Sequence, residues 1–125
     1  MFLIDTNIFL EIMLQQEKKE KCKRFLRENI GKLKISDFSL HSIGIILFKL
    51  GKLDYFGKFI EDILPNIDLL ALDIDLYKNL PKIAEEMNLD FDDSYHYLLA
   101  KSNNLKIVTM DSDFEKIKDV EIIFL

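Results

Sequence analysis

The sequence contains few of the residues that cross-link small domains or separate one domain from another. It has a single cysteine, Cys22, among 125 residues, which excludes an internal disulfide framework and a multi-cysteine zinc site. No stretch is rich in Pro, Gly or Ser, and no apolar run approaches the roughly 20 residues that span a bilayer. The start MFLIDTN has neither the basic nor the long apolar region of a secretory signal. We therefore expect one cytoplasmic domain over residues 1–125, with no membrane segment.

Negative charge is concentrated in the second half of the chain. Residues 1–63 hold 11 Lys and Arg against nine Asp and Glu, a sum of +2, whereas residues 64–125 hold six against 13, a sum of −7. A protein of net charge −5 does not attract nucleic acid through its overall field, so such a role needs a local basic surface or bridging cations. The basic run over residues 18–27 could be such a surface, although its interspersed glutamates favour a solvated helix face.

Short apolar runs alternate with helical patterns along the whole chain. Strands are predicted over residues 1–4, 32–36, 67–72, 106–109 and 120–125. Helical spacing of apolar residues fills the intervals: at 8–13, 22–26, 39–50, 55–64, 74–87 and 93–103, with a short helical turn at 113–117. Asp92 is expected to cap the helix over 93–103, and Pro81 either kinks the segment over 74–87 or opens its second part. This alternation predicts an α/β domain with a mostly parallel sheet and right-handed crossovers.

Aspartates follow two of these strands and open one helix. Asp5 comes directly after the first strand, Asp111 and Asp113 follow the fourth, and Asp92 and Asp93 begin the helix that leads into the fourth. Because active sites of such sheets lie beyond the carboxyl ends of the strands, we expect these carboxylates to gather at one edge. They would repel one another unless a cation neutralised them, and all-oxygen sites suit hard divalent ions. The pattern is typical of metal-assisted phosphodiester hydrolysis.

Each aspartate taken singly is also what a helix start attracts without any function. However, one capping residue serves one helix start, whereas here Asp92 is followed by Asp93 and Asp111 by Asp113. Asp90 is interpreted as a surface acid. The neighbouring polar residues are assigned supporting roles: Thr6 and Thr109 cap or donate hydrogen bonds to carboxylates, Asn7 orients Asp5 or a phosphate, and Tyr95, His96 and Tyr97 are packing and surface groups.

Three segments together resemble a known family. LIDTNIFLE at 3–11, DFDDSYHYLLA at 90–100 and VTMDSDF at 108–114 are similar to the signature segments of PIN domains, especially the small VapC-like toxins. The resemblance implies a Rossmann-like α/β/α sandwich around a five-stranded parallel sheet. It also implies an Mg²⁺- or Mn²⁺-dependent endoribonuclease of single-stranded RNA, usually a homodimer that a small antitoxin protein holds inactive.

The same resemblance assigns roles to individual residues. Asp5, Asp93 and Asp111 match the acidic residues of the family that serve as catalytic groups and metal ligands, and Asp113 matches an auxiliary acid. Asp5 and Asp93 are expected to be the direct metal ligands, with Asp92 beside them.

One departure from the family pattern concerns the helix after the second strand. PIN domains usually place a glutamate near its start, but the chain reads SDFSLHSIGIILFK there and has no glutamate between Glu28 and Glu61. His41 and Ser42 occupy about that position. His41 could approach a metal or a phosphate and Ser42 could bind a metal water, or both are ordinary residues near a helix start.

Three functions therefore remain open at this level. The favoured one is a metal-dependent ribonuclease. The second is a PIN-like module of weak or no activity that binds RNA or a protein, which the missing glutamate favours. The third is a phosphoacceptor domain of the receiver type, which needs a lysine after its fifth strand, and no lysine follows the strand over residues 120–125.

Overall fold

The computed structural model describes residues 1–125 and contains one sheet of five parallel strands. In spatial order the strands are β3 (Asp68–Leu70), β2 (Leu33–Ser36), β1 (Phe2–Ile4), β4 (Lys106–Thr109) and β5 (Ile122–Phe124). All four neighbouring pairs are parallel, so the predicted α/β class is confirmed. Ile4 of β1 pairs with Val108 of β4, and the residues after these two strands therefore lie side by side at the carboxyl edge.

Six α-helices connect the strands. They are α1 (Thr6–Met13), α2 (Lys19–Glu28), α3 (Asp37–Lys49), α4 (Leu53–Lys58), α5 (Leu80–Met87) and α6 (Phe91–Ser102). A π-helical turn (Phe59–Ile63) follows α4, and 3₁₀ turns occur at Leu64–Asn66, Ile74–Asn79 and Ser112–Lys116. None of the helices combines the length and the apolar character that crossing a bilayer requires.

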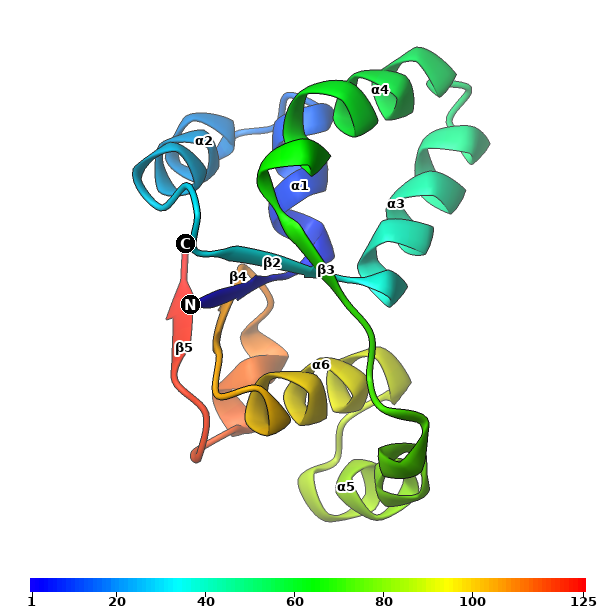
Figure 1. Ribbon diagram of the computed structural model, residues 1–125, viewed down its shortest axis with the longest axis vertical. Coiled ribbons are helices and arrows are strands. Elements are labelled where there is room, and N and C mark those ends of the chain that lie inside the picture. Colours follow the sequence, from blue (N-terminus) through cyan, green and yellow to red (C-terminus); the bar gives the residue numbers. More distant parts are fainter.

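Apolar side chains on both faces of the sheet explain why helices cover both faces. Side chains alternate along a strand, so Leu3 enters one hydrophobic core while Ile4 enters the other, and Ile107 and Val108 of β4 divide in the same way. Figure 1 shows α1 to α4 on one side of the sheet and α5 and α6 on the other. The result is the α/β/α sandwich that the resemblance implied.

Some helix boundaries differ from the predicted ones. The helix predicted over 39–50 begins at Asp37, because Ser36 Oγ accepts a hydrogen bond from the Ser39 N–H at 2.8 Å and caps it two residues earlier. The helix predicted over 55–64 is α-helical only as far as Lys58, and Pro65 lies inside the final 3₁₀ turn rather than beyond the helix. Pro81 opens α5, as one of the two predicted alternatives has it.

Candidate functional site

Asp5 lies at the end of β1 and is held by two hydrogen bonds. Its Oδ1 accepts from the backbone N–H of Thr6 at 2.8 Å, which makes Asp5 the N-cap of α1. Its Oδ2 accepts from the hydroxyl of Thr109, at the end of β4, at 2.7 Å. Thr109 is fully buried, so this hydrogen bond fixes the Asp5 carboxylate against the neighbouring strand.

The Thr109 hydroxyl also holds the segment that carries the later aspartates. Its oxygen accepts from the Asp111 N–H at 2.9 Å and lies 3.4 Å from Asn7 Nδ2. Asn7 Oδ1 in turn accepts from the Met110 N–H at 3.3 Å. Asn7 and Thr109 therefore link the β1 and β4 ends. Thr109 donates to a carboxylate as expected, whereas Asn7 bonds to Thr109 and Met110 rather than to Asp5.

The start of α6 differs from the prediction. Asp90, rather than Asp92, is the N-cap: its Oδ1 accepts from the Asp93 N–H at 3.3 Å, and its carbonyl accepts from Ser94 Oγ at 2.7 Å. Asp90 is thus not simply a surface acid, although its side chain is exposed. The D-x-x-D spacing of Asp90 and Asp93, which resembles a capping box, is the sequence signal that would have placed this boundary. Asp92 and Asp93 consequently lie inside the first turn of α6.

Two sets of carboxylates in the structure are close enough to share an ion. Asp93, Asp111 and Asp113 each offer an oxygen within 4.8 Å of the others, and so do Asp90, Asp92 and Asp93. Asp93 belongs to both sets and is only 5% exposed. The predicted meeting of Asp93 with Asp111 and Asp113 is therefore present, whereas Asp5 belongs to neither set and lies beside them.

Electrostatics at the start of α6 show that this charge is not balanced within the chain. Desolvation by burial, with the charges of Asp92 and Asp90, raises the pKa of Asp93 to about 8. Desolvation and a hydrogen bond with Asp90 raise the pKa of Asp92 to about 6, and the charge of Asp5 contributes to that rise. The hydrogen bond from Asp92 lowers the pKa of Asp90. The three groups thus share protons at neutral pH, which is the response of crowded carboxylates that lack a nearby cation.

The two residues near the position of the missing glutamate lie outside both acidic sets. His41 is exposed, and with Ser42 it lines a hollow of about 250 Å³ together with Phe38, Ile45, Tyr77, Phe91 and Tyr95. Asp37, the acid just upstream, lines the same hollow, and its Oδ1 accepts hydrogen bonds from the Tyr95 hydroxyl and the Phe38 N–H. Helix α3 therefore contributes no carboxylate to either set.

His96 is a buried connecting residue that the sequence reasoning assigned only to packing or surface. It is 3% exposed, and because its Nδ1 lies 2.8 Å from the carbonyl oxygen of Asp92, that nitrogen is the donor. Burial lowers the pKa of His96, so the ring is neutral and Nε2 accepts. Nε2 lies 2.7 Å from Ser36 Oγ and 3.1 Å from Ser39 Oγ.

This chain of polar groups extends to the first helix. The hydroxyl of Thr6 donates to Ser39 Oγ at 2.8 Å, so Thr6 supports the network rather than a carboxylate through its side chain. The network joins α1, the start of α3 and the first turn of α6 beneath the acidic edge.

A comparison with protein families decides the classification. The family model described as the PIN domain matches residues 2–120. The chain belongs to the PIN domain family. PIN domains are generally nucleases, and their acidic groups generally use divalent metals, with which the Asp93-centred sets of this chain are compatible. A search of curated proteins found no match.

Solved structures of PIN domain toxins share this fold at low sequence identity. A DNA-bound VapBC from Salmonella typhimurium is 21% identical with a TM-score of 0.80, covering 97% of this chain and 95% of that one. FitAcB from Neisseria gonorrhoeae is 20% identical with a TM-score of 0.79 and covers 98% and 96%. A toxin–antitoxin complex from Klebsiella pneumoniae is 18% identical with a TM-score of 0.77 and covers 96% and 95%. These likenesses establish the fold of the PIN domain studied here.

Proposed function

We propose that this PIN domain is a metal-dependent endoribonuclease that hydrolyses phosphodiester bonds of single-stranded RNA, as the toxin of a toxin–antitoxin pair. The observation that carries the proposal is the Asp93 carboxylate. Asp93 is 5% exposed and lies among the carboxylates of Asp90, Asp92, Asp111 and Asp113. Burial, with the charges of Asp92 and Asp90, raises its pKa to about 8. All five ion pairs of the structure use other acidic residues. A nearly buried carboxylate among other carboxylates, with no cationic side chain paired to it, is a group that a bound divalent cation would neutralise.

The donor set fits a hard divalent cation. Asp93, Asp111 and Asp113 supply only carboxylate oxygens, which Mg²⁺ and Mn²⁺ accept together with water and phosphate. A cation bound there supplies Lewis acidity toward a phosphate oxygen and lowers the pKa of water. The chain itself contributes position: Thr109 and the Thr6 N–H hold Asp5, and the Thr109 oxygen holds the Asp111 backbone. Asp5 then faces the same edge as a further ligand or as an acceptor for a water proton.

A purified-protein cleavage experiment tests this proposal. Single-stranded RNA is incubated with the protein in Mg²⁺, in Mn²⁺ and in EDTA, beside Asp93→Asn. Cleavage is expected only with a cation and should fall by at least about a hundredfold in the variant, because the shared ligand is lost. The matched control is Asp54→Asn, an exposed acid in the first turn of α4, which should cleave like wild type. Cleavage that persists in EDTA or in Asp93→Asn would overturn the proposal.

A second candidate is a PIN-like module that binds RNA or a protein without cutting it. The observation that favours it is that α3 brings no carboxylate to the acidic edge, since Ser42 and His41 line a separate hollow. Under this function the same experiment gives RNA or partner binding without cleavage in any cation. Retention of intact RNA on the protein in Mn²⁺ would distinguish it from an inactive preparation.

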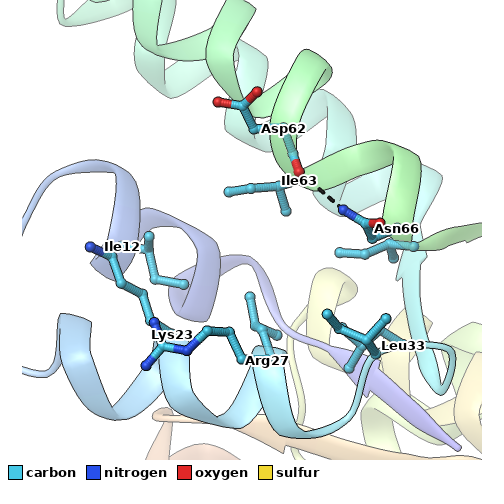
Figure 2. Close-up of a pocket in the computed structure, with 10 residues that line it drawn as sticks. Ile12, Lys23, Arg27, Leu33, Asp62, Ile63 and Asn66 are labelled. Atoms are coloured by element: carbon cyan, nitrogen blue, oxygen red, sulfur yellow. Dashed lines mark hydrogen bonds between the residues drawn. The ribbon is translucent and has the colours of Figure 1, made fainter.

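The antitoxin is proposed to occupy a groove away from the acidic edge. Figure 2 shows this groove, about 250 Å³ in volume, between α1, α2 and the segment that precedes β3. Ile12, Leu33 and Ile63 contribute to its apolar floor, while Lys23 and Arg27 lie along α2. This combination suits a segment with apolar and acidic side chains, and the solved neighbours include a toxin–antitoxin complex. Lys23→Glu with Arg27→Glu should weaken capture of a cognate antitoxin.

A homodimer completes the proposal. Ile45 and Phe48 of α3 are each more than half exposed and line one apolar hollow with Phe56, and such a patch suits an isologous contact with a second copy. Sedimentation of wild type and Phe48→Glu measures this directly. A monomeric wild type at micromolar concentration would contradict the dimer without affecting the cleavage proposal.

A further inference from the structure

The hollow beside the start of α3 is lined mainly by aromatic side chains from three elements. Phe38 belongs to α3, Tyr77 to the 3₁₀ turn before α5, and Phe91 and Tyr95 to α6. The volume of the hollow is about 250 Å³. Pockets for drug-sized molecules measure roughly 300–1,000 Å³, so this hollow suits a smaller ligand such as one planar ring system.

Two of the four rings offer an open surface for stacking. Tyr95 is fully buried, and its ring centroid lies 5.8 Å from that of Phe38, 6.3 Å from that of Phe91 and 6.0 Å from that of Tyr77. Phe91 and Tyr77 are both exposed. Proteins that bind single-stranded nucleic acid stack successive bases on exposed aromatic rings, because every base has a π-face.

Asp37 adds a hydrogen-bond acceptor to the same hollow. Its Oδ1 accepts from the hydroxyl of Tyr95 and from the N–H of Phe38, so the carboxylate is held in place. Both of these bonds end on Oδ1, which leaves Oδ2 to accept from a ligand. Unpaired bases present N–H donors on their Watson–Crick edges, and proteins recognise them there. Aromatic faces beside a fixed acceptor therefore match the chemistry of a base.

The hollow adjoins the acidic edge. Asp37 directly follows β2, and β2 pairs in parallel with β1, which ends just before Asp5. Neighbouring strands of a sheet lie only about 4.8 Å apart. In addition, Phe91 of the hollow and Asp93 of the acidic edge share the first turn of α6. A nucleic-acid strand with one phosphate at the acidic edge thus has the hollow within reach of an adjacent base.

We propose that this hollow binds one unpaired nucleobase of a single-stranded RNA whose neighbouring phosphate lies at the acidic edge. The base stacks on the exposed rings of Phe91 and Tyr77 and donates a hydrogen bond to Asp37. The inference rests on the proposed function in taking single-stranded RNA as the ligand, but it does not require cleavage. It assigns the hollow to substrate binding rather than to contact with another protein.

Stacking of a fluorescent base tests the inference. The probe is a short single-stranded RNA with one 2-aminopurine, whose fluorescence falls when the base stacks on an aromatic ring. The chain contains no Trp, so its own emission does not mask this signal. The protein is titrated in Ca²⁺, which accepts carboxylate and phosphate oxygens, and a gel follows strand integrity. Wild type should quench the probe, whereas Phe91→Ala and Tyr77→Ala should each bind it about tenfold more weakly.

Three further variants separate stacking and hydrogen bonding from a general loss of structure. Phe91→Tyr keeps a ring and should bind like wild type. Ile74→Ala is the matched control for Tyr77→Ala, because Ile74 is exposed on the same 3₁₀ turn but does not line the hollow. Asp37→Asn should weaken binding by about fivefold, although the loss of a negative charge by itself favours RNA. Circular dichroism checks that each variant is folded.

The outcomes separate this inference from the proposed function. If Phe91→Ala and Tyr77→Ala quench the probe like Ile74→Ala, the base site is overturned even when RNA is cleaved. If these variants change only the sedimentation of the protein, the hollow is a protein contact and the base site is likewise overturned. If RNA is never cleaved in any cation while Phe91→Ala has lost the quench and Phe91→Tyr has kept it, the base site stands and the ribonuclease proposal fails.

Discussion

The acidic edge is built from two regions that treat their carboxylates in opposite ways. At the β1 and β4 ends, Asp5 accepts hydrogen bonds from the Thr109 hydroxyl and the Thr6 N–H. At the start of α6, the carboxylate of Asp93 lies among other carboxylates, and burial with the charges of Asp92 and Asp90 raises its pKa to about 8. The first region has its hydrogen-bond donors within the chain, whereas in the second no ion pair involves Asp90, Asp92 or Asp93. Hydrogen bonds thus fix the carboxylate at the β1 and β4 ends, whereas the carboxylates at the start of α6 crowd one another.

The largest effect on stability is expected from removing the hydrogen bonds of the Thr109 hydroxyl. Thr109→Val keeps the shape of a fully buried side chain but removes the donor to Asp5 and the acceptor for the Asp111 N–H. We expect the free energy of unfolding to fall by about 3 kcal/mol, measured by urea denaturation in EDTA. Thr6→Val is the matched control: it removes one hydroxyl bond, to Ser39, and should cost about 1 kcal/mol. Equal losses in the two variants would contradict a special role for Thr109.

A smaller effect on stability is expected when rising pH removes the proton from Asp93 at the start of α6. The folded pKa of Asp93, about 8, lies above the ordinary value of 3.8, so between these values the folded state holds a proton that the unfolded state has released. The contribution of this group to stability is therefore fully present below about pH 4 and is lost as pH rises toward 8. We expect the free energy of unfolding in EDTA to fall by about 2 kcal/mol between pH 5 and 8.

Added Mn²⁺ should reverse this pH dependence, because the ion binds the deprotonated carboxylates and so stabilises the folded state most at high pH. Urea denaturation at several pH values, with Mn²⁺ and with EDTA, measures both slopes. If the free energy of unfolding in EDTA stays flat or rises between pH 5 and 8, the pKa of Asp93 is not raised in the folded protein.

The smallest effect concerns the sign of a single substitution. Asp93→Asn removes a carboxylate that has no counter-charge, so at pH 8 in EDTA it should raise the free energy of unfolding by about 1 kcal/mol. Asp5→Asn replaces an oxygen that accepts from Thr109 and should lower it by a similar amount. Thermal unfolding of the two variants gives the comparison. If Asp93→Asn and Asp5→Asn change the free energy of unfolding in the same direction, the two carboxylates do not differ in this way.

Much of the fold was predictable because it depends on local patterns. Apolar runs at 1–4 and 106–109 read as buried parallel strands and are β1 and β4. The end of α4 was harder to predict. The π-helical turn at Phe59–Ile63 has the same apolar periodicity as an α-helix over so short a span. The start of α6 was misplaced by two residues because Asp90 and Asp92 are equally good caps in isolation.

The candidate site was predictable to the extent that it follows from strand ends. Asp5, Asp93, Asp111 and Asp113 were expected at one edge, and the structure brings the last three within reach of one ion. Their catalytic roles remain predictions that the proposed experiments test. The hydrogen bonds from the Ser36 and Ser39 hydroxyls to Nε2 of His96 could not be predicted, because these groups meet only when α6 packs against the start of α3.

The sequence by itself determined that strands and helices alternate and that acids follow the strands, because both properties depend on residues close together in the chain. Tertiary structure alone decided which carboxylates share space, since that depends on the adjacency of β1 and β4 and on the direction in which α6 meets them. It also decided the contrast between Asp5 and Asp93. Each is an aspartate at a helix start, and only the packing of distant segments gives Asp5 the Thr109 donor and places Asp93, nearly buried, among further carboxylates.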